Sequence, residues 1–215
     1  MKSILIIGMG RFGRSLSEKL LELGNDIMIV DKKEELINEL APRFTNALIG
    51  DATNLSVLKS LGVNNFDVCF VAIGENFQSS LEVTSQLKEL GAKYVVSKAS
   101  SQLQAKFLSR CGADEVTYPE RDMAEKLAVR FNADNIFDYL EISSEFGLFE
   151  IAVPKKWVGS TVLNTKARQA HNINIIAVKH GGSMEMLTGA DYVFRADDHL
   201  VIIGRADDVF SLTNR

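Results

Sequence analysis

Short aliphatic runs alternate with amphipathic helical stretches about six times over the first 119 residues, and this alternation constrains the fold more than any other feature. Such a βα rhythm calls for a parallel sheet with helices on both faces. Because βαβ crossovers are right-handed, we expect a doubly wound α/β fold that binds its ligand where the strand order reverses. The predicted strands are residues 3–7, 26–31, 46–50, 67–74, 94–99 and 114–119, and the helices are 14–24, 32–40, 54–62, 77–91 and 102–112.

Glycines close four of these helical stretches. Gly24, Gly62, Gly91 and Gly112 each stand where a helix would end and where a left-handed residue is wanted. We expect residues 1–134 to form one domain that ends in a connecting helix.

The pattern changes after Tyr118. Residues 119–142 predict a helix, a break near 132–134 and a further apolar stretch, which together indicate a connector. Three later segments, residues 146–154, 163–182 and 191–215, predict brief strands around one or two helices. We therefore expect a small α+β module over residues 135–215.

Charge and hydropathy disfavour two classes of partner. The 24 basic and 28 acidic side chains are interspersed and give a net charge of −4, unlike the one-sided basic face that nucleic acid or an anionic membrane requires. The longest aliphatic run, residues 4–7, is too short to cross a bilayer, and the N-terminus lacks a signal-peptide pattern. We expect a cytoplasmic protein with no nucleic-acid partner and no direct membrane insertion.

The residues that usually carry metal or covalent chemistry form no pattern here. Cys69 and Cys111 are far apart and are predicted to be packing residues. The spacing of His171, His180 and His199 disfavours a zinc site. We find no His/Asp/Arg group in the second module that would orient a hydride acceptor, and no nucleophile with a partnered histidine.

The sequence GMGRFG follows the first predicted strand and opens the first predicted helix. Gly8 permits a tight turn, Gly10 lets the backbone approach a pyrophosphate, and Gly13 lets helix and strand pack closely. Asp31, at the end of the second strand, would accept hydrogen bonds from ribose hydroxyls and would repel the 2′-phosphate of NADP. The alternative is that the glycines serve only the turn and that Asp31 caps the following helix.

Other strand ends supply further candidates. Asp51 would border an adenine or cap the next helix, and both alternatives stay open. Residues 72–76 offer small side chains and backbone groups to a nucleotide, although Asn76 also suits a helix cap. Tyr94 and Lys98 have the YxxxK spacing of short-chain dehydrogenases, but they lie on a predicted strand and the glycine spacing differs from that family's.

These blocks together resemble the Ktr/Trk potassium-uptake regulatory subunits, in particular the cytosolic KtrA type. The resemblance rests on GMGRFG, Asp31, GDAT, FVAIGEN, KAS, GADEVTYPERDMA, INIIAVKHGG and DHLVIIG, and covers essentially the whole chain. It implies a Rossmann-like RCK (KTN) nucleotide-binding domain and a small C-terminal RCK module. It also implies a regulator, not an enzyme, that gates a potassium-translocating membrane protein.

The resemblance further implies a set of ligands. ATP and ADP would be opposing occupants of the N-terminal site, with NAD or NADH as an alternative. Glu120 would help place a divalent or monovalent cation at the phosphates across a subunit interface, although it also suits a helix N-terminus as a plain charge. Carried over by motif, the nucleotide contacts are Gly8, Gly10, Arg11, Phe12, Gly13, Asp31, Asp51, Ala52, Ala72, Gly74, Glu75 and Lys98.

In the KtrA type the C-terminal module also binds cyclic di-AMP between two subunits. By this resemblance Arg168 would meet a phosphate, and Asn174 and Ile175 would line the base pocket. The residue pattern alone favours an ordinary strand and a solvated arginine over a ligand site.

The resemblance implies dimers that assemble into an octameric ring beneath a dimeric potassium-translocating protein, at the inner face of the membrane. Pairing would use residues 102–110 and apolar connector side chains that a small domain would leave exposed. The connector side chains are Phe131, Ile136, Phe137, Tyr139 and Leu140.

A pyrophosphate alone does not require the full positive charge of Arg11, because backbone amides and the helix dipole already suffice to bind it. A guanidinium would discriminate ATP from ADP through a bidentate contact with a third phosphate. The alternative is a surface ion pair with Glu18 or Glu35. Two other function classes stay open: an NAD-dependent oxidoreductase with an unrecognised substrate site, and a redox-sensing repressor, which the acids beside the helix lysines disfavour.

Overall fold

The structure, a computed structural model, describes residues 1–74, 76–186 and 189–213. It divides into two compact units, Met1–Glu120 and Arg121–Arg215. The division falls inside the helix α6 (Pro119–Phe131), so most of this helix belongs to the second unit. The domain limits of 1–134 and 135–215 stay a prediction.

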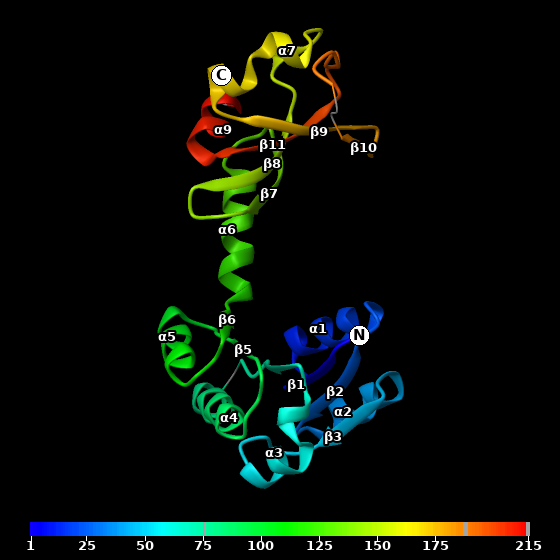
Figure 1. Ribbon diagram of the computed structural model, residues 1–215, viewed down its shortest axis with the longest axis vertical. Coiled ribbons are helices and arrows are strands. Elements are labelled where there is room, and N and C mark those ends of the chain that lie inside the picture. Colours follow the sequence, from blue (N-terminus) through cyan, green and yellow to red (C-terminus); the bar gives the residue numbers. More distant parts are fainter. Residues whose placement is uncertain (75, 187–188, 214–215) are drawn as a thin grey trace. The chain divides into compact units, whose positions relative to one another are not determined.

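Among the described residues, the first unit contains one sheet of six parallel strands in the order β3-β2-β1-β4-β5-β6 (Figure 1). The doubly wound fold is therefore confirmed, and its strand order reverses between β1 and β4. The strands are β1 (Ser3–Ile7), β2 (Asp26–Asp31), β3 (Asn46–Ile49), β4 (Val68–Val71), β5 (Val95–Lys98) and β6 (Glu115–Thr117).

Alternate residues of β1 face two different helical layers. Ile4 and Ile6 pack with side chains of α1 and α2, whereas Leu5 and Ile7 pack with side chains of α3 and α4. Apolar runs therefore form the central strands because both faces of the sheet are covered. The helices are α1 (Arg11–Glu22), α2 (Glu34–Leu40), α3 (Leu55–Leu61), α4 (Phe77–Glu89) and α5 (Gln102–Arg110), with 3-10 turns η1 (Ala41–Arg43) and η2 (Val63–Asn65).

The predicted helix ends are confirmed. Gly24, Gly62, Gly91 and Gly112 all have positive φ, between 60° and 100°. At the other end of two helices, the amide oxygens of Asn54 and Asn76 accept hydrogen bonds from backbone N–H groups in the first turn of α3 and α4. The prediction of a cap at Asn76 is therefore confirmed. The alternative that Asp51 caps α3 is wrong, because Asn54 is the residue that caps this helix.

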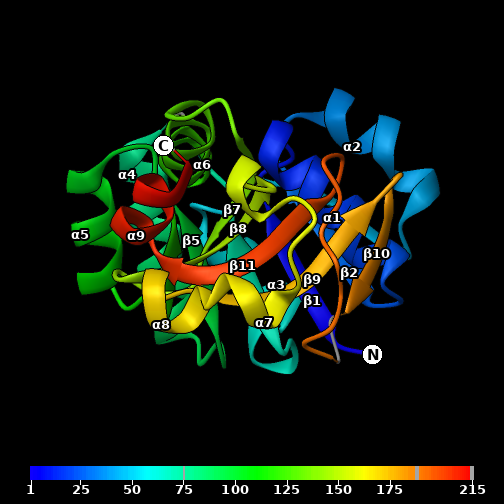
Figure 2. The same cartoon turned by 90° about the horizontal axis from the view of Figure 1, so that it is seen from above.

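In the described part of the second unit, five strands form an antiparallel sheet in the order β10-β9-β11-β8-β7. Figure 2 shows β11 between β8 and β9, with the short α7 and α8 and the C-terminal α9 beside the sheet. The elements are α6 (Pro119–Phe131), β7 (Ile136–Glu141), β8 (Phe146–Ala152), η3 (Lys155–Trp157), α7 (Val162–Thr165), α8 (Ala167–His171), β9 (Asn174–His180), β10 (Ser183–Met186), β11 (His199–Arg205) and α9 (Ala206–Thr213).

The connector was predicted to leave five apolar side chains exposed, and three of them are not. Ile136 is only 4% exposed in the core of the second unit. Tyr139 packs against Phe149 of that core, and Phe137 stacks on His199 with ring centroids 3.9 Å apart. The prediction is wrong for these three because residues 136–141 form strand β7. The remaining two side chains, Phe131 and Leu140, are 75% and 59% exposed.

None of the described helices is both long and apolar enough to span a membrane.

Candidate nucleotide-binding site

The glycine loop lies at the reversal of strand order, between the ends of β1 and β4. Gly8 has φ +100°, and a Cβ there would lie 3.1 Å from the carbonyl carbon of Ala72. A Cβ on Gly13 would lie 2.0 Å from the carbonyl oxygen of Gly8. Both glycines are therefore required by close backbone packing, which brings the start of α1 against the ends of two strands.

Gly10 and Arg11 form the open side of this loop. Gly10 is the N-cap of α1, and no atom lies within 4 Å of the place where its Cβ would be. The backbone at the N-terminus of α1 is therefore open to close approach by a ligand on the side of Gly10, as an anion site requires. Among the described residues no ion pair joins Arg11 to Glu18 or Glu35, since Glu18 pairs with Arg43. The surface-pair alternative for Arg11 is wrong.

Asp31 ties the glycine loop to the end of β2. Its Oδ2 accepts a hydrogen bond of 2.6 Å from the Met9 amide, and its Oδ1 accepts one of 2.8 Å from the Lys33 amide. These bonds fix the orientation of the carboxylate at the edge of the loop, and each oxygen keeps a lone pair that a hydroxyl could use. The carboxylate does not cap α2, whose N-cap residue is Lys33.

Lys98 extends from the end of β5 into the same region. Its Nζ lies 5.8 Å from the Phe12 ring centroid and would lie 3.4 Å from a Cβ on Gly74. It donates a 2.7 Å hydrogen bond to Oε1 of Glu120, at the start of α6. This bond lowers the pKa of Glu120, partly opposed by burial of the carboxyl group, with a smaller contribution from the charge of Arg11.

The remaining predicted contacts lie around this group with different orientations. Asp51 is exposed and accepts hydrogen bonds from the amide and hydroxyl of Thr53, and the hydroxyl bond is the larger cause of its lowered pKa. The side chains of Ala52 and Ala72 are buried in hydrophobic clusters, so only their backbone is available to a ligand. Glu75 lies outside the described residues.

Arg14 supports the loop, and sequence reasoning missed it. Its Nε donates to the Met9 carbonyl at 3.3 Å, and its two terminal nitrogens donate to the carboxylate of Glu39 at 2.8 and 2.7 Å. The bidentate pair lowers the pKa of Glu39. It joins α1 to α2 across 25 positions of sequence, and no short motif signals such a contact.

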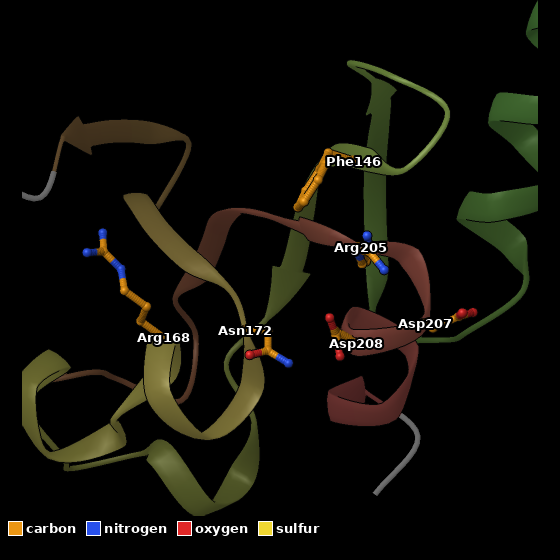
Figure 3. A pocket seen from close by; sticks show the side chains of 6 residues that line it. All are labelled: Phe146, Arg168, Asn172, Arg205, Asp207 and Asp208. Carbon is orange, nitrogen blue, oxygen red and sulfur yellow. The ribbon is translucent and has the colours of Figure 1, made fainter.

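Of the three residues predicted to contact cyclic di-AMP in the C-terminal module, only two lie in contact with each other. Arg168 Nε donates a 2.6 Å hydrogen bond to Oδ1 of Asn174, and both residues are exposed. Ile175 packs against the core of the second unit. Arg168 also borders an open hollow of about 600 Å³, which Asn174 and Ile175 do not line. Figure 3 shows Arg168 and Asn172 on one side of this hollow, opposite Phe146, Arg205, Asp207 and Asp208.

In the second unit a histidine, an aspartate and an arginine lie together. His180 Nδ1 lies 3.0 Å from Oδ1 of Asp198, and Arg195 Nη1 lies 3.4 Å from His180 Nε2. Sequence reasoning missed it because residues 180 and 198 meet only through the pairing of β9 with β11, in which His199 lies opposite Lys179.

A parallel sheet with a glycine loop at its reversal point, followed by a small antiparallel module, is the architecture of a Rossmann-like nucleotide-binding domain with a C-terminal RCK-type module. Comparisons with known proteins agree with this class. A model of the TrkA-N domain matches residues 4–119, and a model of the TrkA-C domain matches residues 148–215. The chain therefore belongs to the Ktr/Trk family of potassium-uptake proteins.

Two relatives from Bacillus subtilis (strain 168) cover the chain. Ktr system potassium uptake protein C is 41% identical over 100% of this chain and 97% of its own length. Ktr system potassium uptake protein A is 34% identical over 99% of this chain and 96% of its own length.

Solved structures resemble the chain in fold. The RCK domain of GsuK has a TM-score of 0.70 at 18% identity, over 100% of this chain and 48% of that chain. The GsuK channel bound to NAD has a TM-score of 0.71 at 18% identity, over 100% of this chain and 40% of that chain. The chain thus spans about half or less of these structures, and at this identity the likeness concerns the fold alone.

Proposed function

We propose that this chain is a nucleotide-sensing regulatory subunit of a potassium-uptake system, not an enzyme, and that it gates a membrane partner according to ATP and ADP. The observation that carries the proposal is the convergence of four strand ends on one place: the glycine loop after β1, Asp31 on β2, Gly74 after β4 and Lys98 on β5. Family membership supplies the transport context.

A nucleotide phosphate and Glu120 would compete for the same ammonium group. The Lys98 side chain is 12% exposed and the Glu120 side chain is 61% exposed, so the carboxylate is the partner that lies nearer the solvent. A bound phosphate would take over the ammonium and release the carboxylate. The released carboxylate would then be available to a cation at the phosphates, including one shared with a second subunit. A ligand can shift a conformational equilibrium only through such state-dependent contacts.

The partner in this proposal is a dimeric potassium-translocating membrane protein, and the chain acts as a ring of dimers at the cytoplasmic face of the membrane. The support is the family, together with exposed apolar side chains on α5, described below. An NAD-dependent oxidoreductase remains the alternative class, and NAD or NADH remains the alternative occupant. The support for both is the same glycine loop, which suits any pyrophosphate.

Calorimetric titration of the purified chain with ATP, ADP and NADH tests the nucleotide site. We expect Lys98→Gln to weaken ATP and ADP binding by roughly tenfold or more, because a hydrogen bond from a charged donor contributes about 1.5–3 kcal/mol. Lys93→Gln is the matched control, since Lys93 precedes β5 at the opposite end and pairs with Asp67. Unchanged binding in Lys98→Gln would contradict the site.

Two further assays test the class of function. Sustained oxidation of NADH with a panel of carbonyl substrates would contradict the regulator and favour the oxidoreductase. Potassium flux into vesicles that hold the chain and its membrane partner should rise with ATP and fall with ADP, and flux that ignores both nucleotides would contradict gating.

Cyclic di-AMP is proposed as a second ligand of the C-terminal module, on the family resemblance. The exposed Arg168, held by Asn174, is available to a phosphate. Titration with cyclic di-AMP should show binding that Arg168→Ala weakens. Equal binding by Arg168→Ala and wild type would remove Arg168 from the proposal.

A further inference from the structure

A histidine and two aspartates meet in the second unit, away from the hollow described above. Oδ1 of the buried Asp198 and Oδ2 of the exposed Asp197 lie 3.0 and 3.6 Å from His180 Nδ1. One ligand atom from each of the three residues lies within 4.8 Å of the other two. The side chains of His180 and Asp197 are 44% and 72% exposed, whereas that of Asp198 is 0% exposed, so the group is reached from solvent past the first two residues.

We infer that this group, His180 with Asp197 and Asp198, is a binding site for a divalent transition-metal ion of the zinc type. The inference does not depend on the proposed nucleotide function. An imidazole nitrogen with two carboxylate oxygens is a donor set that suits zinc or cobalt better than calcium or magnesium, which prefer oxygen alone.

The distances fit this assignment. Zinc binds histidine nitrogen and carboxylate oxygen at about 2.0–2.2 Å, so two such donors lie about 3 Å apart at a right angle and about 3.4 Å apart at a tetrahedral angle. The separations of His180 Nδ1 from the two carboxylate oxygens, 3.0 and 3.6 Å, are close to these values, and the two oxygens lie within 4.8 Å of each other. An ion can therefore replace the proton on Nδ1 with small movements of the side chains.

The buried carboxylate is already oriented by other groups. Oδ2 of Asp198 accepts hydrogen bonds from the Tyr192 hydroxyl at 2.9 Å and from the Arg195 amide at 2.8 Å. These two bonds leave Oδ1 directed at His180. Hydrogen bonds of this kind orient metal-ligating carboxylates and raise the affinity of metal sites.

The nearby charges also favour a cation. Beyond the effect of burial, the charges of Asp198 and Glu185 both raise the pKa of the neighbouring Tyr192, and the guanidinium of Arg195 acts in the opposite direction. Arg195 approaches Nε2 of the imidazole, the nitrogen away from the carboxylates, and its side chain is exposed. It must turn into solvent when Nδ1 binds an ion, because Nε2 then carries the proton. Its presence therefore lowers the affinity without blocking the site.

The experiment is calorimetric titration of the metal-free full chain with Zn²⁺, followed by Co²⁺ absorption spectroscopy. We expect one saturable ion per chain and visible cobalt bands that indicate nitrogen and oxygen ligands. His180→Gln and Asp197→Asn should each weaken zinc binding at least tenfold. Tyr192→Phe should weaken it about tenfold by releasing the carboxylate, and Arg195→Gln should strengthen it.

The matched control is His199→Gln. His199 Nδ1 also pairs with a carboxylate, Oε1 of Glu150 at 2.7 Å, but Lys179 bonds to the same carboxylate and repels a metal ion. Thermal unfolding in chelator must match wild type for each variant. Zinc binding that is equal in His180→Gln and wild type, or lost equally in His199→Gln, would overturn the site, as would the absence of saturable binding.

Discussion

Arg11 is the residue whose role separates ATP from ADP in the proposed function. It is exposed beside the open first turn of α1, and its charge acts on Glu120. We predict that Arg11→Ala leaves ADP binding within a few-fold of wild type and weakens ATP binding roughly tenfold or more, equivalent to about 1.4 kcal/mol. Calorimetry with both nucleotides checks this. Equal losses for ATP and ADP would mean that Arg11 does not contact the third phosphate.

The ion pair between Lys98 and Glu120 makes stability depend on pH. Because the pKa of Glu120 is lowered from its ordinary 4.5, the pair stabilises the fold above that value and loses its effect as the pH falls through the lower folded pKa. Glu120→Gln should therefore reduce the free energy of unfolding at neutral pH by at most about 1 kcal/mol, since the carboxylate is exposed.

Chemical denaturation at neutral pH, and again at a pH below the lowered folded pKa of Glu120, tests this. The difference between Glu120→Gln and wild type should vanish at the lower pH. Glu125→Gln is the matched control for this stability measurement, because Glu125 lies on the same helix with similar exposure and pairs with Arg121. A Glu120→Gln difference that persists at low pH would contradict the assigned pair.

At the scale of elements, alanine substitutions at two glycines of one loop should differ in their effect on stability. Gly13→Ala places a Cβ 2.0 Å from the Gly8 oxygen, so we predict a loss of about 1–3 kcal/mol in the free energy of unfolding. Gly10→Ala meets nothing within 4 Å and has an allowed backbone, with φ −69° and ψ −174°. It should leave stability within about 0.5 kcal/mol.

Nucleotide titration completes this comparison. The methyl group of Gly10→Ala would occupy the space where a phosphate approaches the backbone, so binding should weaken although the fold is intact. A Gly10→Ala protein that binds ATP and ADP as wild type does would show that the nucleotide does not contact this amide.

The sequence predicts the elements of the first unit well because each signal there is local. The strand over Asp26–Asp31 is found at its predicted limits, and the glycines at helix ends have the expected backbone. The stretch at Ile136–Glu141 was placed in a connector because a single apolar run after a helix does not reveal its pairing partner. In the structure, that partner is β8, found only after the chain reverses.

The candidate site likewise contains residues that local motifs predict and residues that only long-range contacts bring together. The glycine loop and Asp31 were predictable because their chemistry lies in one motif and one strand end. The pair of Lys98 with Glu120 was not, since it requires β5 and the start of α6 to lie together. The group around His180 depends on the register between two antiparallel strands, which no spacing in the sequence reports.

At the scale of the whole molecule, α5 and the first residue of α4 together present an apolar surface. Leu103 is 62% exposed, and Phe107 and Phe77 are 40% and 42% exposed and contact each other edge to face. We predict that this surface pairs two subunits, so sedimentation should detect assemblies larger than the 23.8 kDa monomer. Leu103→Asp should shift the distribution toward monomer.

Leu23→Asp is the matched control, because Leu23 is 67% exposed at the end of α1, outside this surface. A monomer at micromolar wild-type protein, with and without nucleotide, would contradict pairing. Equal effects of Leu103→Asp and Leu23→Asp would place the interface elsewhere.

The pair between Lys98 and Glu120 has a consequence for rates. A nucleotide that arrives finds the ammonium group of Lys98 paired with Glu120, and this 2.7 Å bond must open before a phosphate can take its place. Association should therefore be slower than simple electrostatic steering of an anion would allow. Added salt weakens the pair between Lys98 and Glu120, which speeds association, and it also screens the attraction between the site and the nucleotide, which slows association. Salt should therefore change the association rate of the wild type less than that of Glu120→Gln. In the proposed function, the pair would therefore affect the rate of nucleotide binding as well as the affinity.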